Sequence, residues 1–312
     1  MAKVCIVGCG AMGSVYAGLM AAAGHEVHAV TPWQGHVDAI NAHGLHVSGY
    51  SGDRVVRLAS AATTVEGIGP CDVVIIATKA FDVEAAARSV GPLMGADTVV
   101  QTIQNGVGSP DIVARHVDPS HLAVGVVGGY GASIRESGHA HHNGLAVTWF
   151  GAYAGLPRRS LEASAEVWRS SGFDVALHDD VASMVWKKVI MNVAYSGTAG
   201  LTELTIGQII NHPYAWEVAS GCSREAVAVA QALGVDLGLP DPIAHVRALG
   251  GKIPDARPSM LLDLQAGRRC EVDAINGAIV RLGRELGVPT PVNDVVVALI
   301  RAKESLQVSS DG

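Results

Sequence analysis

Three glycines near the first residue of the chain have the spacing of a dinucleotide-binding turn. Gly8, Gly10 and Gly13 form a G-x-G-x-x-G pattern. The apolar run 4–7 precedes them, as expected for a strand, and the stretch 14–24 that follows has the composition of a helix. This order of strand, turn and helix is the context in which the pattern binds the pyrophosphate of a nucleotide. A purely structural glycine-rich turn is the alternative.

Each glycine has a separate task in such a site. Gly8 permits the tight turn, Gly10 leaves room for the pyrophosphate, and Gly13 lets the helix lie close to the strand. The backbone N–H groups of Ala11, Met12 and Gly13 begin the helix, and its positive end attracts phosphate. We therefore expect these five residues to bind a dinucleotide.

Two polar residues follow the ends of buried strands. Lys79 comes directly after the apolar run 73–78, and Asn105 follows the next such run at 98–103. In an open parallel sheet, ligands bind beyond the carboxyl ends of the strands. The ammonium of Lys79 suits a carboxylate or a phosphate, and the amide of Asn105 suits a ribose or a substrate. The alternatives are a solvated lysine and a plain turn, since Asn-Gly is a common turn pair.

A third set of polar residues lies in the second half of the chain. Lys188 and Asn192 are four residues apart and share one face of a predicted helix, whereas Lys187 is rotated by about 100°. A buried lysine is costly unless it is paired or used. Glu271 and Asp273, at the predicted start of a later helix, are its candidate acid–base partners. The alternatives are lysines that extend to water and acids that only favour the helix dipole.

A histidine cluster could suggest a metal. His139, His141 and His142 lie beside an Asn-Gly pair. No cysteine or acidic ligand is nearby, and the alternation of a strand would separate the three imidazoles. We therefore predict a hairpin with surface histidines and no metal site.

The elements that must position these residues change in type along the chain. Strands and helices alternate in the first half, which predicts an α/β class with a Rossmann-type, doubly wound parallel sheet. Long helical periods follow, which predict an all-α carboxyl-terminal domain. We place the boundary so that residues 1–178 form the nucleotide-binding domain and 179–312 the helical domain. The expected strands are 3–7, 26–30, 72–77, 98–103 and 122–127, with a small hairpin at 45–48 and 55–58 and edge strands near 138–151. The expected helices are 11–23, 36–43, 83–90, 111–116, 182–195, 214–233, 259–266, 273–286 and 293–306.

Composition narrows the classes of function. The 312 residues carry a formal net charge of −7, which argues against nucleic acid as a partner because phosphate binding needs a basic face. The five cysteines form no C-x-x-C pair, so we expect reduced core thiols rather than disulfides. Apolar runs are interrupted before they reach the length of a membrane span, and no signal peptide is visible. We expect a cytoplasmic protein with no membrane partner.

Taken in order, the motifs resemble those of the ketopantoate reductase family, which reduces 2-dehydropantoate to pantoate with NADPH. The resemblance covers nearly the whole chain, and the ordered set is far more specific than any single motif. The motifs are Gly8-x-Gly10-x-x-Gly13, Thr78-Lys79-Ala80, Gln104-Asn105-Gly106-Val107-Gly108, Trp186-Lys187-Lys188 with Asn192, Ser259-Met260 with Asp263, Glu271-Val272-Asp273 and Ile275-Asn276-Gly277.

The resemblance implies which residues carry the chemistry. Lys188 resembles the family's catalytic lysine, which donates a proton to the keto oxygen of the substrate. Glu271 resembles the acid that holds the substrate hydroxyl, orients that lysine and lies at the cofactor. The implied reaction is hydride transfer from a nicotinamide to the keto carbon of a small anionic 2-keto acid, with a positioned cation at the developing alkoxide.

The resemblance also implies the contacts around this pair. Lys79 and Asn105 match positions at which the family contacts the cofactor and the active site. The resemblance also implies that Asn105 contacts the substrate. Asn192 and Ser259 match substrate-binding positions. Ser196 stands where the family usually has another asparagine, one helical turn after Asn192.

Two further departures bear on specificity. The stretch 255–258 has no asparagine where the family often has one, and the turn 31–36 has neither the arginine that favours NADP nor the acid that favours NAD. The resemblance favours NADP(H), and NAD(H) stays an alternative. A 3-hydroxyacid-type dehydrogenase of similar architecture and a non-catalytic NAD(P)-binding sensor are the rival functions. The apolar helices of the second half are compatible with a homodimer.

Overall fold

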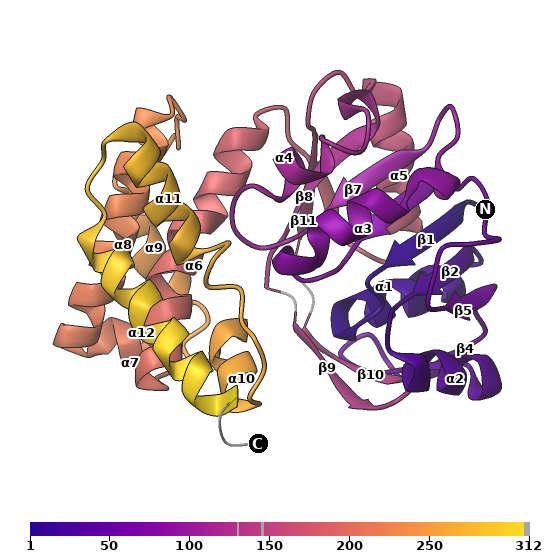
Figure 1. Cartoon of the computed structure of the whole chain (residues 1–312), viewed down its shortest axis with the longest axis horizontal. Coiled ribbons are helices and arrows are strands. Elements are labelled where there is room, and N and C mark those ends of the chain that lie inside the picture. Colours follow the sequence, from indigo (N-terminus) through magenta and orange to yellow (C-terminus); the bar gives the residue numbers. More distant parts are fainter. Residues whose placement is uncertain (130, 145–146, 309–312) are drawn as a thin grey trace. The chain divides into compact units, whose positions relative to one another are not determined.

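Strands from the first 177 residues of the chain form one large and one smaller sheet (Figure 1). The structure, a computed structural model, describes residues 1–129, 131–144 and 147–308. The chain divides into two compact units, which are Met1–Gln104 with Ser109–Val181 and Asn105–Gly108 with Ala182–Gly312.

The large sheet is doubly wound, as the sequence predicts. Its order is β12-β11-β8-β7-β6-β1-β2-β5. The strands are β1 Lys3–Val7, β2 Glu26–Val30, β5 Ser60–Ala62, β6 Val73–Ile76, β7 Val99–Thr102, β8 Leu122–Val127, β11 Thr148–Ala152 and β12 Val175–Leu177. The predicted parallel sheet is extended at one edge by two strands of opposite direction. β11 pairs with β8 in the antiparallel sense, so β11 and its parallel partner β12 run against the other six strands.

Alternate residues of each central strand face two different cores. Val4 and Ile6 belong to one apolar cluster, while Cys5 and Val7 belong to another. Both clusters are buried because helices cover both faces, which explains why these strands have almost unbroken apolar sequences. Helices α1 Ala11–Ala22 and α5 Arg158–Ser170 contribute to the first core, and α3 Val83–Ser89 and α4 Ser109–Val113 to the second. Helix α2 is Gln34–His43, and three short 3-10 turns are η1 Ala80–Asp82, η2 Gly91–Leu93 and η3 Pro119–His121.

A smaller sheet contains the histidine cluster. Its order is β4-β3-β10-β9, with β3 Leu45–Gly49, β4 Arg54–Val56, β9 Gly131–Glu136 and β10 His139–Gly144. β3 and β4 form the predicted antiparallel hairpin. The prediction of surface histidines is wrong for His142, which is completely buried, and His139 and His141 are only partly exposed. His142 shares the inward face of β10 with buried Ala140, because side chains alternate between the two faces of a strand.

Helices make up the second unit. They are α6 Val181–Thr202, α7 Ile206–Asn211, α8 Pro213–Ala232, α9 Pro242–Gly250, α10 Ser259–Gln265, α11 Asn276–Leu286 and α12 Pro291–Val308. The described residues of this unit contain no strand, in agreement with the predicted all-α class. Two predicted boundaries are clearly wrong, since α6 continues to Thr202 instead of ending at residue 195, and α11 begins at Asn276 and not at Asp273. The N–H groups of Ala274 and Ile275 both donate to the Glu271 carbonyl, which makes a turn there before the helix starts.

All five cysteines are free and buried, as predicted. Within the described residues, no helix combines the length and the apolar character needed to cross a membrane.

Candidate functional site

The glycine turn after β1 has the geometry that its sequence predicts, with close approaches at Gly8 and Gly13 and open space at Gly10. Gly8 has a φ of +101°, and a Cβ added there would lie 2.4 Å from the Thr78 nitrogen. A Cβ on Gly13 would lie 2.4 Å from the Gly8 carbonyl oxygen, so α1 packs directly on the turn. A Cβ on Gly10, in contrast, would meet no described atom within 4 Å. Gly8 and Gly13 are therefore required by the fold, while the space beside Gly10 is open.

The start of α1 offers donors toward that open space. Gly10 is the N-cap residue and has no side chain with which to cap the helix. The N–H groups of the first turn, from Ala11 to Gly13, have no intrahelical acceptor because they begin the helix. Open space, orphan donors and the positive end of a helix together fit a pyrophosphate.

A buried histidine, which the sequence analysis missed, fastens this helix start. His36 is completely buried, and the Gly138 N–H donates to its Nδ1 at 2.9 Å. Nε2 therefore carries the ring hydrogen and donates to the Ser14 hydroxyl at 3.0 Å. Burial lowers the pKa of His36, so the ring is neutral near pH 7. No local sequence pattern indicates this role, because both partners are distant along the chain.

The exposed neighbour of His36 is aromatic. Trp33 precedes α2 and stacks on the His36 ring, with 4.9 Å between centroids and 14° between planes. Its side chain is 43% exposed, so the turn after β2 presents a flat apolar face.

Lys79 and Asn105 follow the strand ends as predicted, but they belong to different units. Lys79 is partly buried at the start of η1, after β6. Gln104 lies two residues after the end of the neighbouring strand β7, and its Nε2 donates to the carbonyls of Ile76 at 2.7 Å and Thr78 at 3.2 Å. It thereby fixes the end of β6 that leads to Lys79.

The segment Asn105–Gly108 is fastened to the turn before α11. Val107 donates its N–H to the Ala274 carbonyl at 3.0 Å. A Cβ on Gly106 would lie 1.9 Å from that same oxygen, so only glycine permits this approach. Asn105 is therefore tied, through its own loop, to the turn that contains Glu271.

Lys188 and Glu271 form a charge pair in the second unit. Burial lowers the pKa of the Lys188 ammonium to about 8, and the negative charge of Glu271 opposes that shift. Glu271 is only 6% exposed. Asp273, the other candidate acid, is exposed and makes two hydrogen bonds with the Arg301 guanidinium, at 2.6 and 3.1 Å. Of the two acids that the sequence left open, Glu271 is therefore the one that acts on the lysine.

The remaining predicted residues lie on α6 and α10. Asn192 and Ser196 follow Lys188 at intervals of four residues on α6, which places all three on one helix face. Asn192 is partly buried and Ser196 is buried. Ser259 is exposed at the first position of α10, and its contact with a substrate stays a prediction.

The histidines of the small sheet bond to polar neighbours. His139 and His141 both contact the Ser48 hydroxyl, at 2.7 and 3.1 Å, and His46 stacks on His139 with 3.8 Å between ring centroids. Among the described residues, no group of three or more His, Cys, Asp or Glu side chains could hold a metal ion.

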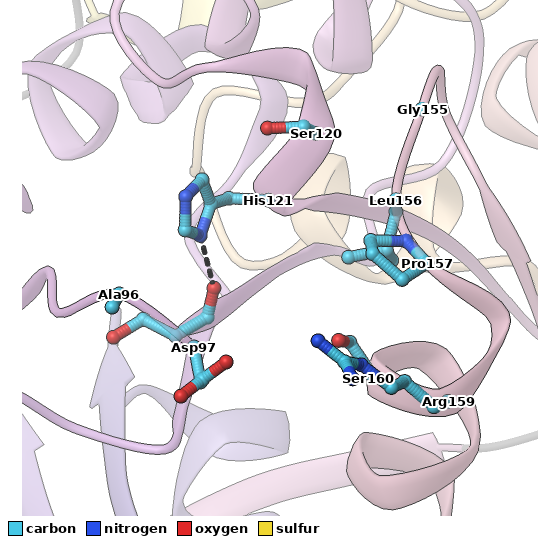
Figure 2. Close-up of a pocket in the computed structure, with 10 residues that line it drawn as sticks. Ala96, Asp97, Ser120, His121, Gly155, Leu156, Pro157, Arg159 and Ser160 are labelled. Atoms are coloured by element: carbon cyan, nitrogen blue, oxygen red, sulfur yellow. Dashed lines mark hydrogen bonds between the residues drawn. The ribbon is translucent and has the colours of Figure 1, made fainter.

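A small hollow lies at the other end of the large sheet (Figure 2). Its volume is about 170 Å³, and it is bordered by residues that precede β7 and β8 and by the start of α5. His121 donates from Nδ1 to the Thr98 carbonyl at 2.6 Å, and exposed Asp97 and Arg159 line the hollow (Figure 2). The glycine turn follows the carboxyl end of β1, so this hollow is separate from the predicted site.

Comparisons with known proteins point to one family along nearly the whole chain. The sequence model described as Ketopantoate reductase PanE/ApbA matches residues 4–155, and its C-terminal counterpart matches residues 180–304. The 2-dehydropantoate 2-reductase of Archaeoglobus fulgidus is 30% identical over 303 residues, which cover 97% of this chain and 98% of that protein.

Two solved structures extend the comparison. A PanE/ApbA family ketopantoate reductase from Ralstonia eutropha is 33% identical, with a TM-score of 0.88 over 98% of this chain and 99% of the other. A D-mandelate dehydrogenase solved with NADH and anilino(oxo)acetate is 26% identical, with a TM-score of 0.89 and the same coverage.

Proposed function

The chain belongs to the ketopantoate reductase family, and from that premise we propose that it reduces 2-dehydropantoate, or a closely related small 2-keto acid, to the 2-hydroxy acid. Like the family, it is an oxidoreductase that uses a reduced nicotinamide coenzyme. The observation that carries the proposal is the buried Lys188 beside the charge of Glu271, because burial lowers the pKa of this proton donor to about 8 while Glu271 stabilises its charged form.

The coenzyme phosphates would be held at the glycine turn. Gly8 and Gly13 shape the turn, the open space at Gly10 admits the pyrophosphate, and the N–H groups of Ala11 and Met12 begin the helix that faces it. When bound, a reduced nicotinamide supplies the hydride. We assign Lys79 and Asn105, carried over from the family pattern, as further contacts to the coenzyme.

Lys188 is the proposed general acid. With a pKa of about 8, it is mostly protonated at pH 7 and still gives up its proton more readily than an ordinary lysine. Its ammonium would donate to the keto oxygen as negative charge develops there, which also stabilises that charge. Glu271 holds the ammonium in place and is also a proposed contact to the substrate hydroxyl and the coenzyme.

Four residues are proposed to bind the substrate. Asn192 and Ser196 share the helix face of Lys188, and Asn105 is tied to the turn of Glu271. Their amide and hydroxyl groups can donate hydrogen bonds to a carboxylate. Ser259 is carried over from the family pattern.

The family resemblance favours NADP(H) as the coenzyme. We expect the protein to discriminate only weakly between NADP(H) and NAD(H). The turn 31–36 brings no charged side chain, and His36 is neutral. An arginine–phosphate pair worth ~1.5 kcal/mol would favour NADPH by a factor of about ten. Without it, we expect the two coenzymes to differ by less than about tenfold. The similar D-mandelate dehydrogenase was solved with NADH, which supports keeping NAD(H) as an alternative.

At the level of the whole chain, we propose that residues 1–178 serve the coenzyme and 179–312 the substrate, in a cytoplasmic homodimer. Exposed apolar residues on α12 support the homodimer. Val295, Leu299 and Leu306 are 58, 50 and 74% exposed, and their spacing places them along one side of the helix. A second copy of the chain would cover them.

One specific observation favours a second substrate class. The D-mandelate dehydrogenase resembles this chain over 98% of its length, so an aryl 2-keto acid is the second candidate. Initial rates with 2-dehydropantoate, with the 2-keto acid that corresponds to mandelate and with a 3-keto acid, each with NADH and NADPH, distinguish the candidates. We expect the first acid to be reduced fastest. Oxidation of 3-hydroxy acids alone would favour the 3-hydroxyacid dehydrogenase, and coenzyme binding without any turnover would favour a sensor.

A further inference from the structure

An asparagine in the core of the second unit connects its own helix to two others. Asn276 is completely buried at the first position of α11. Its Nδ2 donates to the Val193 carbonyl on α6 at 3.0 Å and to the Asn293 Oδ1 on α12 at 2.9 Å. Both amide hydrogens are therefore used, and each fixes α11 to a different helix.

From Asn276 the hydrogen bonds continue through Asn293 to the carboxylate of Glu225, with each amide donating to the next acceptor. Asn293 donates from Nδ2 to the Cys222 carbonyl at 3.1 Å and to the Glu225 Oε2 at 2.7 Å, both on α8. Glu225 also accepts the backbone N–H groups of Val292 and Asn293, at 2.8 and 2.9 Å. Since a carboxylate accepts and cannot donate, it sets the orientation of both amides, and hydrogen bonds to a charged acceptor are strong.

The surface of α6 is shaped to let Asn276 approach. A Cβ added to Gly197 would lie 3.1 Å from the Asn276 Oδ1 and 2.4 Å from a methyl carbon of Val296. A side chain at this position would push α11 and α12 away from α6. The approach of the helices thus depends on a glycine on one side and a fixed amide on the other.

The two segments that Asn276 joins also carry the charge pair. Lys188 and Val193 are five residues apart on α6, about 7.5 Å along its axis. Glu271 and Asn276 are the same number of residues apart, and the intervening turn is closed by hydrogen bonds to the Glu271 carbonyl. A change in the spacing between α6 and the start of α11 would therefore change the spacing of Lys188 and Glu271.

We propose that Asn276 is a positioning residue, oriented by Asn293 and Glu225, that sets the separation of the Lys188 ammonium and the Glu271 carboxylate. The proposal rests on the proposed function of that pair. It predicts an effect on the proton-transfer step and not only on folding, because the negative charge of Glu271 keeps the pKa of Lys188 from falling further.

The test compares Asn276→Ala with Ile209→Val, a mild core change on α7 outside this hydrogen-bonded chain. For Asn276→Ala we expect kcat of keto-acid reduction to fall by at least about tenfold, because small displacements of a catalytic group are costly. The alkaline midpoint of the kcat–pH profile should move down by about half a unit, with coenzyme Kd unchanged. Ile209→Val should change neither. An Asn276→Ala variant with a lower Tm but normal kcat and midpoint would overturn the proposal.

A second variant covers the case in which Asn276→Ala does not fold. Glu225→Gln keeps an acceptor oxygen and removes the charge that orients the two amides. We expect a smaller fall in kcat, about threefold or more, and a shift of the midpoint in the same direction. Unchanged kcat and midpoint in a folded Glu225→Gln variant would refute the proposal. Failure of the proposed function would be seen separately, as full activity in Lys188→Ala.

Discussion

At the scale of single residues, the central feature is a lysine in a desolvated position beside one acid. The sequence indicates Lys188 and two candidate acids, but it cannot select between them because the choice depends on the turn before α11. In the structure that turn directs Asp273 to Arg301, and Glu271 is the acid whose charge acts on Lys188. His36 shows the same limit, since its partners Ser14 and Gly138 are brought together only by the fold.

The pH dependence of reduction follows from the lysine. Reduction consumes a proton, so it needs the ammonium form, and the pKa of Lys188 is about 8. We expect kcat to be high at pH 6–7 and to fall as the pH rises through about 8. The measurement is kcat at saturating substrate and coenzyme across pH 6–10. A flat profile in Lys188-containing enzyme, with the chemical step rate-limiting, would be inconsistent with this assignment.

The two acids provide a matched pair of variants. Glu271→Gln removes the negative charge that holds the ammonium, so we expect kcat to fall by about tenfold or more and the alkaline midpoint to move to lower pH. Asp273→Asn removes an exposed ion pair with Arg301 and should leave both quantities unchanged. Equal losses in the two variants would contradict the selection of Glu271.

At the scale of elements, the strands with unbroken apolar runs are well predicted, because burial on both faces leaves a clear signal. β1 and β2 match the predicted ranges completely. Helix α5 was not predicted, although it covers the first core. The pattern of apolar residues cannot predict the reversed direction of β11 either, because the same alternation suits a parallel and an antiparallel strand.

The turn between β1 and α1 can be tested by adding a single methyl group at Gly10. Gly10→Ala places a methyl group in open space, so we expect stability to change by less than about 1 kcal/mol. The methyl group would obstruct the pyrophosphate, and coenzyme affinity should fall by at least about tenfold. Gly91→Ala is the control, because its Cβ also meets no described atom within 4 Å. Thermal unfolding and coenzyme titration measure the two effects, and normal affinity in Gly10→Ala would place the phosphates elsewhere.

At the scale of the whole molecule, two units of different class are evident from the change in sequence pattern. The exception is the segment 105–108, which the contacts place with the second unit although the chain places it in the first half. Sequence order cannot indicate this assignment, because it depends on the contacts of Gly106 and Val107 with Ala274. The predicted boundary at residues 178–179 stays a prediction.

For the whole molecule we predict a homodimer. If a second copy covers the exposed apolar residues of α12, light scattering should give twice the mass of one chain. Leu299→Glu would place a charge in that interface and should shift the mass to that of a monomer. A monomeric wild-type protein would show that these residues have another role.

The most direct measurement is the single-turnover rate of hydride transfer from the bound coenzyme to the 2-keto acid that is reduced fastest. Wild-type protein is compared with Lys188→Ala and with the neighbouring control Lys187→Ala. We predict a loss of at least about a hundredfold for Lys188→Ala, with coenzyme still bound, and less than about twofold for Lys187→Ala. A Lys188→Ala variant that transfers hydride at the wild-type rate would contradict the proposed mechanism.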